Sequence, residues 1–141
     1  MKVLHNQHQV LARGASKLVL AGVTDVEGER FAASHAPDID AAFAGAPADA
    51  PRVLLAHQPR FAKRAAGHRV ALQLSGHTHG GQIFPFMVFV RLQQPVVSGL
   101  RTLHGVLTYT SKGTGYWGPP FRLGPRGEIT EITLRAAPAT S

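Results

Sequence analysis

A strand–helix–strand pattern between residues 52 and 74 constrains the fold of this chain more than any other feature. Residues 52–56 form an almost continuously apolar run, as buried parallel strands do. Pro59 suits a first helical position, apolar residues follow at helical spacing from Phe61, and Gly67 is a suitable C-terminal stop. Residues 70–74 form a second apolar run. The connection of about a dozen residues is long enough for a crossover between parallel strands, so the pattern predicts an α/β fold.

The remaining segments predict further strands around this unit. Short β-prone runs occur at residues 3–4, 9–11 and 17–23, and alternating patterns at 105–111 and 128–134 predict two later strands. Residues 38–43 fit a short helix. The apolar stretch 83–90, which contains Pro85, and the Gly/Pro/aromatic stretch 113–125 are expected to be loops or lids. With 141 residues, the chain has the length of one domain.

Composition limits the partners of the chain. The formal net charge of +7 favours anionic partners such as phosphate esters or an anionic membrane. The basic residues are scattered, which disfavours a nucleic-acid-binding tail. The absence of cysteine excludes disulfides and thiolate metal sites.

Hydropathy bears on location. No signal peptide is visible, and the longest apolar run, 83–90, is far shorter than the roughly 20 residues of a spanning helix. We therefore expect a cytoplasmic chain. Residues 83–90 would make peripheral contact with the inner membrane, or alternatively pack on the core.

Three histidines follow the strands of the central unit. His57 comes after the first strand, and His77 and His79 lie in the glycine-rich sequence Gly-His-Thr-His-Gly-Gly-Gln after the second. Neighbouring parallel strands bring their C-terminal ends together, and residues two apart in extended chain face the same way. Imidazole is a good ligand for Zn, Fe, Ni and Cu. His57, His77 and His79 are therefore candidate metal ligands; each taken alone fits a hydrogen-bonded structural histidine.

The same region carries candidate substrate-binding groups but no acid. Residues 50–127 contain no Asp or Glu, although a divalent hydrolytic site normally uses carboxylates. Gly80 and Gly81 would let a ligand approach the main chain closely. Arg122 is the best candidate for a cation that faces phosphate, with structural packing of the surrounding aromatic loop as an equal alternative.

Together these motifs resemble a known family. The sequences Leu-Leu-Ala-His-Gln-Pro (54–59) and Leu-Gln-Leu-Ser-Gly-His-Thr-His-Gly-Gly-Gln (72–82) are similar to the C-terminal half of a calcineurin-like metallophosphoesterase. With residues 22–25 and 113–115, they resemble the bacterial branch of membrane-associated phosphodiesterases, which includes enzymes that cleave the pyrophosphate of a nucleotide-linked acylated sugar. The resemblance implies a partial α/β/β/α sandwich whose N-terminal half is missing. Residues 1–135 would be the C-terminal part of a single domain, and 136–141 a flexible tail.

The resemblance also implies a chemistry. His57 and His77 would bind one metal and His79 the other, in a centre of two divalent ions (Mn, Fe or Zn). A hydroxide that these ions activate would hydrolyse a phosphomonoester, phosphodiester or pyrophosphate, including a lipid-linked one. Three neutral imidazoles cannot balance two divalent ions, so the bridging carboxylate, like the family's catalytic histidine, is expected in the missing half. Asp25 is not expected to take the bridging role.

Two alternatives to an enzyme fragment stay open. The chain could be a catalytically inactive metal-binding remnant, or a basic module that binds a membrane or nucleic acid. A sheet without its first strands would also expose an apolar edge, which predicts poor autonomous folding.

Overall fold

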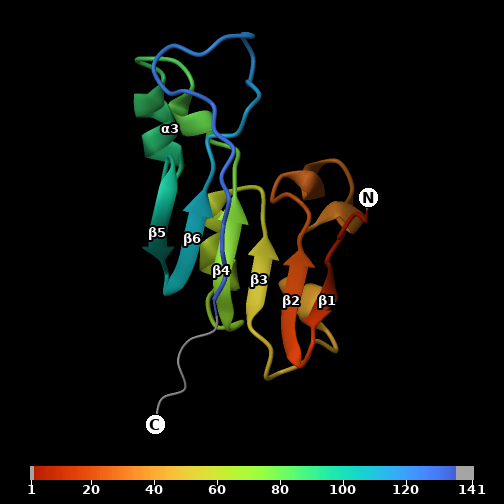
Figure 1. The fold of residues 1–141 in the computed structure, drawn as a ribbon. Coiled ribbons are helices and arrows are strands. Elements are labelled where there is room, and N and C mark those ends of the chain that lie inside the picture. The colour runs from red at the N-terminus through yellow and green to blue at the C-terminus, as the bar shows by residue number, and fades with distance from the viewer. Residues whose placement is uncertain (1, 136–141) are drawn as a thin grey trace.

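Six strands form one mixed sheet in the computed structural model, which describes residues 2–135 (Figure 1). The strand order is β1-β2-β3-β4-β6-β5; β2, β3, β4 and β6 run parallel, and the edge strands β1 and β5 are antiparallel to their neighbours. The bounds are β1 Gln7–Arg13, β2 Ser16–Gly22, β3 Arg52–Leu55, β4 Val70–Ser75, β5 Gly99–Leu103 and β6 Val106–Thr110.

The helices are short and lie in the connections. They are α1 Ile39–Phe43, α2 Ala62–Ala65 and α3 Met87–Gln93, with 3-10 turns η1 Gly28–Arg30, η2 Ala33–His35, η3 Pro59–Phe61 and η4 His79–Gly81. The carboxylate of Asp38 caps α1 by accepting a hydrogen bond from the Ala41 N–H at 2.9 Å. Pro59 opens the turn that leads into α2, as predicted.

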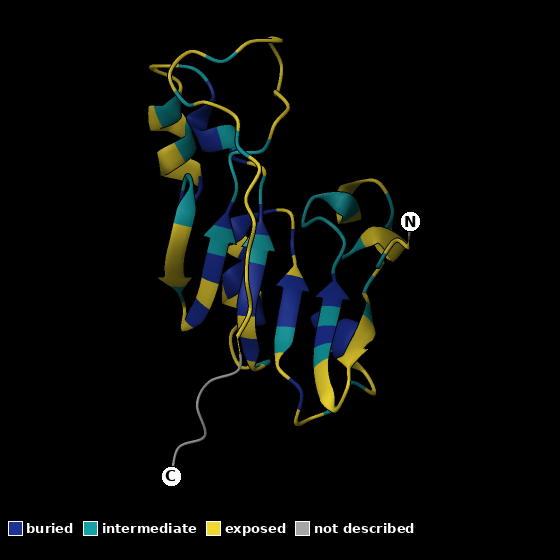
Figure 2. Cartoon of the chain, viewed as in Figure 1, coloured by how far each residue is buried: buried dark blue, intermediate teal, exposed yellow. Residues whose placement is uncertain are grey.

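The core lies on one face of the sheet. Val19, Ala21 and Leu54 point from the strands toward Phe43 of α1 and Phe61 of the η3–α2 segment, and all are buried. Figure 2 shows this buried layer as dark blue along the central strands. The predicted α/β class is therefore confirmed, and the layer of sheet and helices corresponds to part of an α/β/β/α sandwich.

The opposite face of the sheet is only partly covered. Leu55 and Leu107 are 37% and 39% exposed there. Residues 128–135 run across this face without joining the sheet (Figure 1). The Tyr109 hydroxyl donates to Glu128 Oε1 at 2.9 Å and lies 2.6 Å from Thr130 Oγ1. The predicted strand at 128–134 is wrong, because an alternating sequence fits any extended segment with one side against a surface, and here no strand lies beside it to pair with.

Three further segments differ from the prediction. The stretch 83–90 begins as a loop but passes into α3, and β5, which the sequence did not indicate, pairs with β6. β5 is an edge strand without a buried residue, so it lacks the apolar alternation that identifies a half-buried strand. Residues 3–4 form no strand.

Two findings concern the chain end and possible membrane-spanning helices. The expected tail at 136–141 lies outside the described residues. Among residues 2–135, no helix is both long and apolar enough to cross a membrane.

Candidate metal centre

Three consecutive parallel strands present side chains of the candidate site at their C-terminal ends. Asp25 follows β2, His57 follows β3 and His77 follows β4. The loops after β3 and β4 continue the pairing of these strands, since Ala56 N–H donates to Leu74 O at 3.1 Å and Gly76 N–H to His57 O at 2.9 Å. His57 and His77 are thereby held side by side, as their positions after neighbouring parallel strands predict.

The two imidazole rings meet directly. Nε2 of His57 lies 3.2 Å from Nδ1 of His77, with the ring centroids 5.0 Å apart and the ring planes at 76°. Two nitrogens that bind one tetrahedral ion at about 2.05 Å each stand about 3.3 Å apart. The nitrogen spacing therefore fits a shared divalent ion as well as it fits a hydrogen bond, and both side chains are solvent-accessible.

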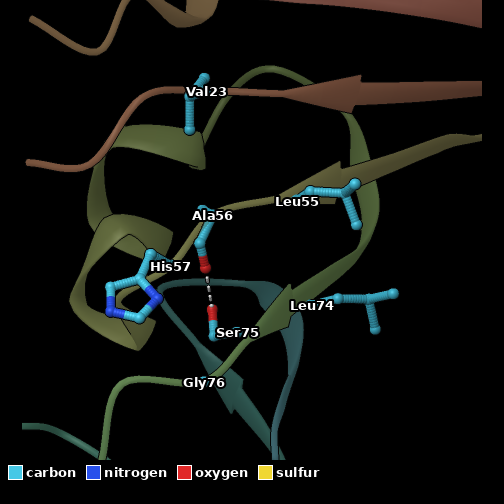
Figure 3. A pocket seen from close by; sticks show the side chains of 7 residues that line it. All are labelled: Val23, Leu55, Ala56, His57, Leu74, Ser75 and Gly76. Carbon is cyan, nitrogen blue, oxygen red and sulfur yellow. Dashed lines mark hydrogen bonds between the residues drawn. The ribbon is translucent and has the colours of Figure 1, made fainter. Parts of the chain in front are cut away.

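His57 also borders a hollow at the strand ends. The hollow has a volume of about 380 Å³. Figure 3 shows the His57 ring beside it, at the loop after β3, with Gly76 opposite at the end of β4. The lining residues are Val23, Leu55, Ala56, His57, Leu74, Ser75 and Gly76.

His79 takes a different position from the other two histidines. Its carbonyl oxygen accepts a hydrogen bond from Arg122 Nη1 at 2.9 Å, and its Nδ1 lies 3.5 Å from Arg122 Nη2. Within residues 2–135, no three His, Asp or Glu side chains converge as a metal-binding group. The structure thus brings two predicted ligands together and places the third beside a guanidinium.

The pKa values of His77 and His79 are both lowered. Partial burial is the main cause at His77, followed by the neighbouring His57, whereas the carboxylate of Asp25 acts in the opposite direction. At His79, burial again comes first and the charge of Arg122 second. A lowered pKa keeps an imidazole neutral at pH 7, which is the form that binds a metal ion.

A buried polar network supports the His57 loop from the core side. Gln73, which is fully buried, donates from Nε2 to Ser75 Oγ at 2.9 Å, and the Ser75 hydroxyl donates to Ala56 O at 2.7 Å (Figure 3). Gln58 Nε2 donates to Asp25 Oδ1 at 3.0 Å. These residues anchor the segment on both sides of His57. A Gln inside an apolar strand was the available sequence signal for Gln73.

Asp25 is the acid associated with this site. Its Oδ1 accepts from Glu27 N–H at 2.8 Å and from Gln58, whereas its buried Oδ2 has no hydrogen-bond partner in the described part of the chain. A buried carboxylate oxygen without a partner is costly. The charge of this carboxylate acts on His77 and favours a cation next to the histidine pair.

Gly80 and Gly81 are buried rather than open to a ligand. Both have positive φ, and a Cβ on Gly81 would lie 2.4 Å from Met87 Cβ. A Cβ on Gly80 would lie 2.8 Å from Lys112 Cγ. The two glycines thus let η4 turn tightly under α3 and Lys112. Their predicted contact with substrate stays a prediction.

Arg122 organises the loop that contains it. Its guanidinium donates to four backbone carbonyls, those of His79, Lys112, Gly113 and Gly115. This geometry favours the structural alternative, because each of its nitrogens already has a carbonyl partner. A phosphate contact of Arg122 stays a prediction.

Gln82 is a further structural residue that the sequence did not single out. Its amide nitrogen donates to the carbonyls of Trp117, Pro119 and Phe121 at 2.8–3.1 Å, and its Oε1 accepts from Trp117 N–H. The last residue of the glycine-rich motif thereby holds the aromatic loop 113–125 next to the histidines.

Comparison with known proteins identifies the family. The chain is 44% identical over 145 residues to a protein from Bos taurus named "Transmembrane protein with metallophosphoesterase domain", an alignment that covers 96% of this chain and 33% of the relative. An uncharacterized metallophosphoesterase of Helicobacter pylori is 45% identical over 101 residues, covering 70% of this chain and 27% of the relative. The chain belongs to the calcineurin-like metallophosphoesterases.

The alignments cover only part of each relative. The uncharacterized metallophosphoesterase YkuE of Bacillus subtilis is 35% identical over 60% of this chain and 31% of its own length. This metallophosphoesterase chain therefore spans about a third of the length of these curated relatives. No protein-family model matches it, and no solved structure does.

Proposed function

We propose that this metallophosphoesterase chain contributes histidine ligands to a divalent-metal centre that hydrolyses a phosphate ester or pyrophosphate. The observation that carries the proposal is the 3.2 Å approach of His57 Nε2 and His77 Nδ1 at adjacent strand ends. His57 and His77 would hold one ion, and His79, beyond Thr78, would reach a second. When bound, the ions supply Lewis-acid stabilisation of the charged phosphoryl oxygens.

The residues of this chain have defined tasks in that centre. The Gln73–Ser75–Ala56 hydrogen bonds keep His57 at the strand end, and the low pKa of His77 keeps its imidazole neutral. Asp25 contributes negative charge near the cation. The described residues supply no carboxylate in a bridging position, so the identity of the metals, Mn, Fe or Zn, depends on further ligands.

A second candidate function is metal binding without turnover. It is favoured by the absence of a three-ligand group within residues 2–135. Nucleic-acid binding has no comparable support, since it rests on net charge alone.

One experiment separates the two candidates. The purified 141-residue chain is titrated calorimetrically with Mn²⁺ and then assayed with a chromogenic phosphodiester. Hydrolysis that is lost in His77→Ala would support the hydrolytic centre and exclude metal binding without turnover. Binding of Mn²⁺ without hydrolysis would assign only the metal-binding role to this chain, with turnover depending on further ligands. Absence of saturable binding of Mn²⁺, Zn²⁺ and Fe²⁺ would overturn both.

A further inference from the structure

The helix α3 is mostly apolar and yet buries none of its residues. Five of the seven residues in its sequence Met-Val-Phe-Val-Arg-Leu-Gln are apolar, and Phe89 and Leu92 are 58% and 79% exposed. A helix that is hydrophobic all round is normally buried in a protein core or in a membrane. Figure 2 shows α3 in teal and yellow at the end of the molecule that also carries the exposed loop 113–125.

This loop extends the apolar area into one surface. The ring of Phe86 stacks on that of Trp117 with centroids 6.0 Å apart, and Phe86 also contacts Phe89 at 5.8 Å. Phe84 N–H donates to Leu123 O at 3.0 Å. We call this the aromatic surface; its exposed members are Phe84, Phe86, Val88, Phe89, Leu92, Tyr116, Trp117, Phe121 and Leu123.

The segments that form the aromatic surface carry charges of one sign. Arg91 projects from α3 and Arg126 follows the loop, both exposed, and residues 50–127 contain no Asp or Glu. Exposed Trp, Tyr and Phe together with cations are typical of segments that lie in the interface of an anionic bilayer. The Gln82 hydrogen bonds to the carbonyls of residues 117, 119 and 121 hold the loop backbone, while the side chains of Trp117 and Phe121 stay exposed.

We propose that the aromatic surface docks on a membrane that contains anionic phospholipids. The apolar side chains would enter the boundary between headgroups and acyl chains, with Arg91 and Arg126 among the phosphates. Both components are needed, because a single weak membrane signal gives only marginal binding. This proposal goes beyond the proposed hydrolysis and does not depend on it.

Trp117 makes the proposal directly measurable, because it is the one tryptophan of the sequence. The chain is mixed with vesicles of phosphatidylcholine alone or of phosphatidylcholine with phosphatidylglycerol. We expect the emission of Trp117 to shift to the blue and its quenching by acrylamide to fall with the anionic vesicles, and added salt to weaken the effect.

Variants test the two components separately. Arg91→Glu is expected to weaken binding to anionic vesicles by at least about fivefold, whereas the matched charge reversal Arg13→Glu, on the exposed edge strand β1, is expected to bind like the unmodified chain. Phe89→Ser should weaken binding to a similar degree, and far-ultraviolet circular dichroism checks that each variant is folded.

Three results would overturn the proposal. Trp117 emission that vesicles leave unchanged would exclude docking. Equal weakening by Arg91→Glu and Arg13→Glu would reduce the effect to net charge. Blue-shifted emission without vesicles that depends on protein concentration would show that a second copy of the chain covers the aromatic surface instead.

Discussion

The rings of His57 and His77 lie nearly perpendicular to each other, and Nε2 of the first is 3.2 Å from Nδ1 of the second. They come from residues 20 positions apart in sequence and meet because β3 and β4 are parallel neighbours. In a metallophosphoesterase chain, we interpret this pair as two ligands of one divalent ion.

Removal of either ring should abolish the shared site. We expect His57→Ala and His77→Ala each to lower Mn²⁺ affinity at least about tenfold, because one imidazole remains where two could bind the ion. The control is His104→Asn in the β5–β6 turn, where φ is +50° and Asn tolerates this conformation. Equal affinities of all three variants, measured by titration calorimetry, would contradict the assignment.

Metal binding should weaken at acidic pH, and His77 contributes to this dependence. Protonation removes the lone pair that binds the ion, so affinity falls as pH decreases through the pKa of the ring. Because burial and His57 lower that pKa from 6.5, we expect the His77 ring to titrate with a midpoint below pH 6.5. Ring-nitrogen NMR of the metal-free chain measures the titration, and a midpoint above 6.5 would count against the environment described here.

The carboxylate of Asp25 should matter for stability through its hydrogen bonds. Asp25→Ala removes the acceptor for Gln58 Nε2 and Glu27 N–H and is expected to cost about 1–3 kcal/mol of unfolding free energy. Asp25→Asn keeps an oxygen acceptor and should cost less. Asp49→Ala, in an exposed loop, serves as the control in urea denaturation; an equal cost for Asp25→Ala and Asp49→Ala would refute the prediction.

Gly81 and Gly99 offer a matched pair of backbone tests. Both have φ near +85°, but a Cβ on Gly81 would lie 2.4 Å from Met87 Cβ, whereas nothing lies within 4 Å at Gly99. Gly99→Ala should cost only the conformational strain, about 1–2 kcal/mol. Gly81→Ala adds a clash with the start of α3, for which we expect about 1–3 kcal/mol more. Thermal unfolding measures the difference, and similar costs would show that α3 moves freely.

Glu128 should stabilise the protein only at a pH where its carboxylate is ionised. The Lys112 N–H, the Lys112 ammonium and the Tyr109 hydroxyl all bind its carboxylate, which lowers its pKa from 4.5. The folded state therefore binds the proton less readily than the unfolded state, so the contribution is complete above about pH 4.5 and disappears as pH falls through the lowered pKa.

The corresponding experiment compares two neutral variants. Glu128→Gln is expected to cost about 1–2 kcal/mol at pH 7 and to unfold like the unmodified chain at strongly acidic pH. Glu131→Gln, at an exposed position, should be close to neutral throughout. A pH-independent cost of Glu128→Gln in urea unfolding would attribute the effect to packing rather than charge.

Sequence patterns predicted the central unit well because its signals are local. The apolar runs of β3 and β4, Pro59 at the helix start and the histidines directly after the strands all follow from short-range chemistry. The edge strand β5 and the helix α3 were not predicted, because neither buries a residue and neither shows an amphipathic period.

What the sequence determined by itself is the parallel α/β unit and the adjacency of His57 and His77, since strand ends of a parallel pair must meet at one edge. Tertiary structure alone decided that His79 lies beside Arg122 and that residues 128–135 cross the sheet unpaired. It also decided that side chains of Lys112 and Met87 occupy the space next to Gly80 and Gly81. Each of these depends on which distant segment packs against the residue, and a pattern of neighbouring residue types carries no record of that.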